Sequence, residues 1–101
     1  MDIISYIGQQ IKWSRATFGE GRRTKGIIEH IKLELVEIEA EPDHLMEWVD
    51  VIILALDGAW RSGHTPYEIV DALLKKAQIN HTRTYPKPES EDVPVLHVPE
   101  D

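Results

Sequence analysis

The chain has 101 residues, a net charge of −7, 42% hydrophobic residues and 29% charged residues, which is typical of one globular domain. The acidic balance argues against a direct nucleic-acid partner, because neutralising phosphates requires surplus lysine and arginine. The lack of cysteine excludes disulfides and thiol catalysis, and the longest apolar run, Val51–Leu56, is too short to cross a bilayer. We therefore expect a cytoplasmic protein with no membrane partner.

The first segment predicts a helix followed by a basic loop. Asp2 can cap this helix, which places Ile3, Ile7 and Ile11 on one face. Trp13 lies in the same helix and is either a core anchor or a surface on which a nucleobase stacks. Residues 17–26 contain three glycines and three basic residues, but without a Walker motif they are a weak signal for phosphate binding.

The second expected helix, residues 26–41, has an acidic flank beside its apolar stripe. At about 100° per residue, Glu34 and Glu37 fall at the edge of the buried face, where burial without a counter-charge is costly. His30 and Glu41 lie on the same flank. The stripe itself consists of Ile27, Ile31, Leu35 and Ile38.

A third helix is expected over residues 45–61, after a turn at Pro42, with Asp43 as its N-cap. This segment is apolar nearly all round, which predicts a helix buried on most sides. In a chain this small, such burial requires a partner subunit, so we expect a homo-oligomer. The narrow polar stripe of this helix consists of Glu47, Asp50, Asp57 and Arg61.

The turn at Pro42 is expected to bring two carboxylate pairs together. Glu34 and Glu37 are three residues apart, and so are Glu47 and Asp50. Glu37 and Glu47 each lie five residues from Pro42, so they stand at matching heights on an antiparallel helix pair. Four converging carboxylates favour a metal bound by oxygen, Mg²⁺ or Mn²⁺ rather than zinc. The alternative is that these acids pair with arginine or lysine.

The C-terminal part predicts a fourth helix and a tail. The segment Thr65–Glu68 is a capping box with proline at the first helical position. Lys76, Asn80 and Arg83 follow at four- and three-residue steps, which suits either a polyphosphate or an exposed helix end. From Pro86 onward, four prolines and five acids predict an extended tail. We therefore expect a helical domain over residues 1–85 and a tail over residues 86–101.

These motifs resemble the all-α nucleoside triphosphate pyrophosphohydrolases of the MazG superfamily. Their signature is Glu-Glu-x-x-Glu, then an inter-helix segment, then Glu-x-x-Asp. Residues 33–37 and 47–50 are similar, with Leu33 in place of the first glutamate. Lys76, Asn80 and Arg83 resemble the family's Lys-x-x-x-Asn-x-x-Arg end. The phage-associated dATP/dGTP diphosphohydrolase branch, MazZ, is the most similar, notably over residues 17–19, 47–61 and 83–86.

The resemblance implies an antiparallel four-helix bundle that assembles as a dimer or a dimer of dimers. It implies cleavage of dGTP or dATP to the monophosphate and pyrophosphate, with two or more Mg²⁺ or Mn²⁺ ions per site. The metal ligands would be Glu34, Glu37, Glu47 and Asp50, and Glu37 or Glu34 would be the catalytic base. In the MazZ branch, located in the host cytoplasm if phage-encoded, the dGMP formed would feed synthesis of 2-aminoadenine DNA.

The resemblance also assigns the substrate-binding residues. Lys76, Asn80 and Arg83 would neutralise the leaving pyrophosphate. Trp13 with Gln9 or Gln10 would bind the base, and Asp57 would contact the sugar or a metal.

Two other functions fit parts of the sequence. A di-metal redox bundle requires histidine ligands, and only His30 is well placed; the Glu41-x-x-His44 pair falls in the proline turn. A non-catalytic helical dimerisation or regulatory module explains the apolar third helix. It leaves the four carboxylates without a role.

Overall fold

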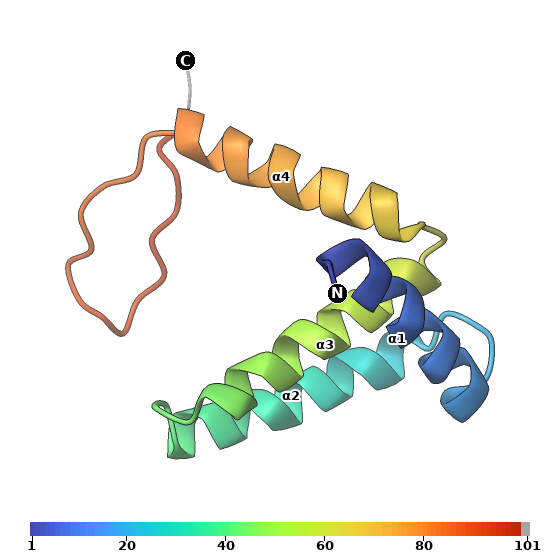
Figure 1. Ribbon diagram of the computed structural model, residues 1–101. Coiled ribbons are helices and arrows are strands. Elements are labelled where there is room, and N and C mark those ends of the chain that lie inside the picture. The colour runs from blue at the N-terminus through green and yellow to red at the C-terminus, as the bar shows by residue number, and fades with distance from the viewer. Residues whose placement is uncertain (100–101) are drawn as a thin grey trace. The chain divides into compact units, whose positions relative to one another are not determined.

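The computed structural model describes residues 1–99, which contain four α-helices and no strand. The helices are α1 (Ile3–Phe18), α2 (Thr24–Ala40), α3 (Leu45–Arg61) and α4 (Pro66–Thr82) (Figure 1). The predicted all-α class and the four helices are confirmed. The chain divides into two compact units, Met1–Val70 and a second unit that begins at Asp71.

Local capping fixes the start of α1 and of α4 as predicted. The Asp2 carboxylate accepts a hydrogen bond from the backbone N–H of Ser5 at 2.7 Å. At α4, the N–H of Thr65 donates to Glu68 Oε1 at 3.0 Å, and the N–H of Glu68 donates to Thr65 Oγ1 at 3.2 Å. This reciprocal pair is the expected capping box.

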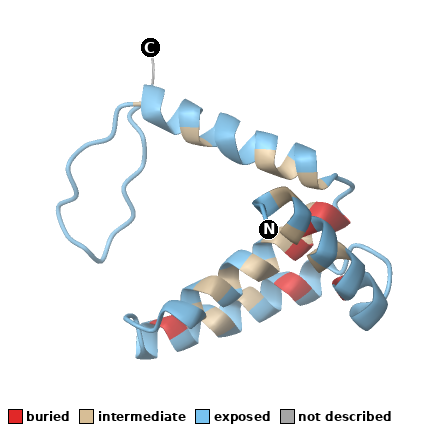
Figure 2. Cartoon of the chain, viewed as in Figure 1, coloured by how far each residue is buried: buried red, intermediate tan, exposed pale blue. Residues whose placement is uncertain are grey.

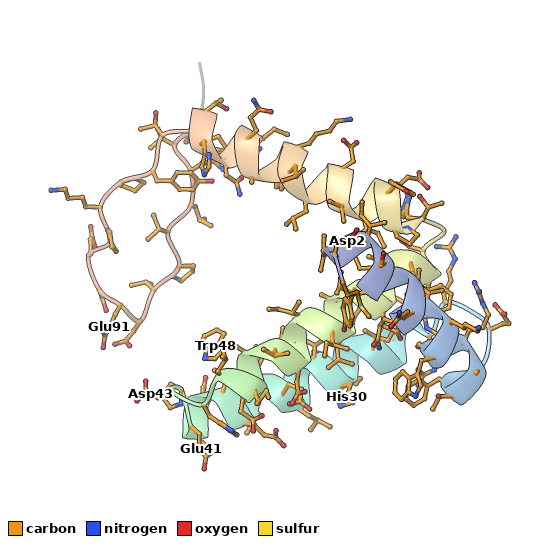
Figure 3. The ribbon with its side chains drawn as sticks, viewed as in Figure 1. Asp2, His30, Glu41, Asp43, Trp48 and Glu91 are labelled. Atoms are coloured by element: carbon orange, nitrogen blue, oxygen red, sulfur yellow. The ribbon has the colours of Figure 1, made fainter. Side chains whose placement is uncertain are left out.

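The turn between α2 and α3 differs from its prediction at one residue. The N-cap of α3 is His44, with no side-chain capping bond, and not Asp43. The reason is that the N–H of His44 donates to the carbonyl of Glu41 at 3.1 Å, which places Asp43 inside the turn. The indole N–H of Trp48, on α3, donates a hydrogen bond to the Pro42 carbonyl at 2.9 Å, which links the turn to the helix (Figure 3).

In the first unit, α3 packs against both α2 and α1, and α2 and α3 form an antiparallel hairpin (Figure 1). The buried apolar side chains are Ile7, Ile27, Ile38 and Trp60 (Figure 2). Leu35, expected in the buried stripe of α2, is 47% exposed. The prediction for Leu35 was wrong because α3 covers only a narrow sector of α2.

One apolar strip of α3 is exposed to solvent in the single chain. Leu45, Trp48 and Ile52 are at least half exposed, while the buried residues of α3 are Asp57, Trp60 and Arg61. Burial on most sides is therefore not achieved by one chain. The predicted homo-oligomer, which would cover this strip, stays a prediction.

The second unit contains most of α4, on which no residue is buried, and the segment that follows it. This segment has neither helix nor strand up to residue 99. Its ends meet where the N–H of Val98 donates to the carbonyl of Thr84 at 2.7 Å and the Tyr85 and His97 rings pack edge to face. The predicted four-helix bundle, the domain boundary at residue 86 and the tail stay predictions. No helix within residues 1–99 is long and apolar enough to cross a bilayer.

Candidate functional site

Three of the four predicted carboxylate ligands converge in the hairpin. Glu34 and Glu37 from α2 and Glu47 from α3 each offer an oxygen, and these oxygens lie within 4.8 Å of one another. The short turn produces this convergence, because it sets the two helices antiparallel with Glu37 and Glu47 at equal distances from Pro42. Asp50 stands one turn further along α3, and its negative charge acts on Glu34.

The cluster is electrostatically unfavourable without a cation. Burial, followed by the charges of Glu37 and Asp50, raises the pKa of Glu34 above its ordinary value. Hydrogen bonding with Glu37, followed by burial and the charges of Glu37 and Glu34, raises the pKa of Glu47. The side chains of Glu34 and Glu47 are only 13% and 17% exposed.

The donor set fits a hard divalent cation. The Oε2 atoms of Glu34 and Glu47 are buried and have no hydrogen-bond partner within residues 1–99. A buried carboxylate oxygen without a partner is costly, and a metal ion would satisfy both oxygens. Because all the donors are carboxylate oxygens, they suit Mg²⁺ or Mn²⁺. The alternative pairing with arginine or lysine is not found for any of the four acids within residues 1–99.

Two exposed histidines flank the cluster instead. His30 Nε2 lies 3.3 Å from Glu34 Oε1, and His44 Nδ1 lies 3.4 Å from Glu47 Oε1 and 3.6 Å from Glu41 Oε2 (His30 and Glu41 are labelled in Figure 3). His44 does lie in the turn, as predicted, yet it comes close to Glu47. The proximity of His44 to Glu47 could have been predicted from sequence, because His44 lies three residues before Glu47 and directly at the start of α3.

A pocket of about 260 Å³ extends from the carboxylates along the groove between α2 and α3 to α1. Trp13 lines it and is 55% exposed within the single chain, which argues against the core-anchor interpretation. The Trp13 and Phe18 rings meet edge to face, with centroids 5.5 Å apart. Gln10 also lines the pocket, whereas Gln9 does not. The pocket is therefore an aromatic recess that opens beside Glu34 and Asp50.

Asp57 lines the same pocket but is held by a buried network. One carboxylate oxygen accepts hydrogen bonds from the Ser14 hydroxyl and from the Trp60 indole, and the other accepts from Arg61 Nε at 2.9 Å. Hydrogen bonds from Ser14 and Trp60 and the charge of Arg61 outweigh the opposing effect of burial, so the pKa of Asp57 is lowered. The network joins α1 to α3 behind the pocket.

Arg61 also holds the loop between α1 and α2. Its Nη1 donates to the carbonyls of Gly19 and Gly21, both at 2.9 Å, and its Nη2 donates to Ser14 Oγ at 3.0 Å. The sequence pattern did not predict the burial of Ser14 or this role of Arg61. The available signal was the four-residue spacing from Asp57 to Arg61, opposite charges on the polar stripe of a largely apolar helix.

The predicted phosphate-binding trio belongs to the second unit. Lys76 and Asn80 lie on α4, but α4 ends at Thr82, so Arg83 follows the helix and does not continue its face. The carbonyl of Asn80 accepts from the N–H of Arg83 at 3.2 Å, and Asn80 Oδ1 accepts from the Tyr85 hydroxyl at 3.5 Å. The predicted role of the trio stays a prediction.

Comparison with known proteins assigns this chain to a family. The family model described as dATP/dGTP pyrophosphohydrolase matches residues 6–101, which includes the C-terminal segment. The "Eaa protein" of Salmonella phage P22 is 36% identical over 61 residues, which is 60% of this chain and 19% of that protein. The chain thus matches less than a fifth of this relative's length. No solved structure matches.

Proposed function

Because the chain belongs to the dATP/dGTP pyrophosphohydrolase family, whose members are hydrolases acting on nucleoside triphosphates, we propose that it cleaves purine deoxynucleoside triphosphates. The products are the monophosphate and pyrophosphate, and the site is the carboxylate cluster between α2 and α3. The observation that supports this proposal most directly is the pair of buried, unpartnered oxygens on Glu34 and Glu47. Carboxylates left in this state suit a metal-assisted reaction.

Glu34, Glu37, Glu47 and Asp50 would together hold two or more Mg²⁺ or Mn²⁺ ions. Bound there, such ions polarise a phosphoryl oxygen and lower the pKa of a coordinated water. The hairpin sets the geometry, since each helix supplies two carboxylates and the Trp48–Pro42 bond fixes the turn between them. Glu37 or Glu34 would accept the proton of the attacking water at a carboxylate oxygen.

The pocket beside the cluster would receive the nucleoside. Trp13 would stack on the base, and Gln10 would offer an amide to it, because both line the recess. Asp57 would act mainly by holding the pocket wall, since both its oxygens already accept hydrogen bonds from protein groups. Its sugar contact, and the base contact of Gln9, stay predictions.

Three further parts of the proposal concern the rest of the chain. Lys76, Asn80 and Arg83 would bind the leaving pyrophosphate, and the two cations among them would neutralise its charge, as cations do in other phosphoryl transfers. Residues 1–85 would form the enzymatic domain, with residues 86–101 as a tail, and the protein would work as a dimer or a dimer of dimers. Supply of dGMP for 2-aminoadenine phage DNA is the proposed biological role; the similar protein of phage P22 is consistent with a phage origin.

A second candidate is a non-catalytic helical dimerisation module. The exposed apolar strip of α3, formed by Leu45, Trp48 and Ile52, favours it. Such a module would need the strip and would not need the carboxylates.

Product analysis separates the two candidates. The protein is incubated with MgCl₂ or MnCl₂ and each deoxynucleoside triphosphate, and the products are resolved by anion exchange. We expect monophosphate and pyrophosphate from dGTP or dATP, loss of turnover in Asp50→Asn, and full turnover in Glu39→Gln, an exposed acid on α2. Diphosphate and phosphate as products would refute cleavage at the α-phosphorus. A folded protein that turns over no nucleotide would favour the dimerisation module.

A further inference from the structure

Arg23 lines the pocket at the end remote from the carboxylates. It is the N-cap of α2, and Ile27, His30 and Glu34 follow on the pocket side of the same helix. Arg23 and Glu34 are separated by about 16 Å along the helix, at about 1.5 Å per residue. If the phosphates lie at Glu34 and Asp50, the Arg23 end of the groove is the nucleoside end.

The backbone of Arg23 is unusual for an arginine. Its φ of 48° and ψ of 24° are left-handed, and within residues 1–99 it is the one non-glycine residue with positive φ. Glycine adopts this conformation freely, whereas L side chains seldom do. As an N-cap, Arg23 also supplies no side-chain bond to the helix. Local structure therefore does not account for arginine at this position.

The side chain lies over an aromatic ring that lines the pocket. The guanidinium carbon lies 5.1 Å from the centroid of the Phe18 ring, and Phe18 in turn contacts Trp13. A Cβ atom added at Gly26 would lie 4.0 Å from Arg23 Nη2, so the guanidinium folds back over the first turn of α2. Within residues 1–99 it forms no ion pair, which leaves its donors free for a ligand.

Loop packing keeps this arrangement in place. Arg61 binds the carbonyls of Gly19 and Gly21, which lie four and two positions before Arg23 on the same loop. The loop that leads to Arg23 is therefore anchored to α3.

We propose that Arg23 reads the N7/O6 edge of the purine base and ranks dGTP above dATP. An arginine has five N–H donors and no acceptor. Guanine presents two acceptors on this edge, N7 and O6, whereas adenine presents N7 and the N6 amino donor. The guanidinium can therefore donate twice to guanine and once to adenine, and pyrimidines lack N7 altogether. This inference rests on the proposed function, because it assumes that the pocket holds the nucleoside of a triphosphate.

The test compares kcat/KM for dGTP and dATP in the wild-type protein and in Arg23→Gly. Glycine suits the left-handed backbone, so this variant removes the side chain without straining the loop. We expect the wild type to prefer dGTP by about tenfold and the variant to lose most of that preference. Arg22→Ala, at the exposed neighbour that does not line the pocket, is the matched control and should keep the wild-type ratio.

Two analogues identify the atoms that are read. Deoxyinosine triphosphate keeps N7 and O6 but lacks the 2-amino group, and we expect the wild type to treat it like dGTP. The 7-deaza analogue of dGTP lacks N7, and its kcat/KM should fall in the wild type but not in Arg23→Gly. Deoxyinosine triphosphate behaving like dATP would overturn the inference, because the enzyme would then be reading the 2-amino group.

The outcomes also separate this inference from the proposed function. Release of pyrophosphate with a dGTP to dATP ratio that Arg23→Gly leaves unchanged overturns the role of Arg23 alone. An equal fall for both substrates does the same, since Arg23 would then bind a group common to them. Failure of the wild type to release pyrophosphate from any deoxynucleotide overturns both.

Discussion

Replacing Arg61 with methionine should destabilise the protein strongly. The Arg61 side chain is fully buried and its Asp57 partner is 9% exposed, with 2.9 Å between Nε and Oδ2. Methionine fills a similar volume but leaves the Asp57 carboxylate buried without its cation. It also removes the donors to Gly19, Gly21 and Ser14.

The expected loss is about 3–5 kcal/mol, the usual cost of removing one partner of a buried ion pair. For a domain of this size, each kcal/mol lowers Tm by about 4–8 °C, so Tm should fall by at least about 12 °C. The measurement is thermal unfolding followed by circular dichroism, repeated with urea. The double variant Asp57→Asn/Arg61→Met should lose less than Arg61→Met alone, because it leaves no buried charge unpaired.

The chain contains a matched control for this experiment. Lys75 and Asp71 also form a pair four residues apart at 2.9 Å, but their side chains are 72% and 62% exposed. Lys75→Met should therefore cost less than about 1 kcal/mol. Equal losses for Lys75→Met and Arg61→Met would refute the argument that burial makes the Arg61 pair important.

Three other predictions concern the site and its loop. In EDTA, the raised pKa values of Glu34 and Glu47 mean that the folded state keeps protons that the unfolded state has lost, so the free energy of unfolding should fall as pH rises above about 4.5. In urea titrations at several pH values, Glu47→Gln should flatten this fall, and it should also abolish the rise in Tm on adding MnCl₂. An unchanged pH dependence in Glu47→Gln would contradict the role of Glu47 in the cluster. Trp13→Ala should raise KM for nucleotide while leaving Tm nearly unchanged, because the side chain is 55% exposed; a large drop in Tm would instead restore the core-anchor interpretation. Gly19→Ala should cost about 1–3 kcal/mol by thermal unfolding, because φ is 85° and ψ is −177°, whereas Gly8→Ala, at an open helical position, should be neutral or stabilising.

Local chemistry explains which features were predictable from sequence. The caps at Asp2 and at Thr65 and Glu68 join residues three positions apart, so a short stretch of sequence names both partners of each hydrogen bond. The convergence of Glu37 and Glu47 was predictable for a similar reason. A short turn centred on Pro42 makes the two helices antiparallel, so residues at equal distances from Pro42 face each other. Both predictions depend on contacts between residues close in sequence.

The features that were missed depend on long-range contacts or on what covers a surface. Ser14 and Asp57 are 43 positions apart, and nothing at Ser14 itself signals burial. The apolar pattern of α2 identified a face correctly, but it could not tell how wide a sector α3 would cover, and Leu35 fell outside that sector. The left-handed backbone at Arg23 could not be predicted either. Three glycines lie nearby in the sequence, and glycine is the residue expected to adopt a positive φ.

The hydrogen bonds of Arg61 have a consequence for the order in which the molecule folds. The carboxylates proposed as metal ligands lie within residues 34–50 and need only a hairpin to meet, whereas the bonds from Arg61 to α1 and its loop close segments of 40 to 47 residues. Closing longer segments costs more chain entropy before any contact is gained. We therefore expect hairpin substitutions to slow folding, and Arg61 substitutions mainly to speed unfolding. A chain whose hairpin had formed before α1 docked would bring the proposed metal ligands together before the pocket that α1 helps to line had formed.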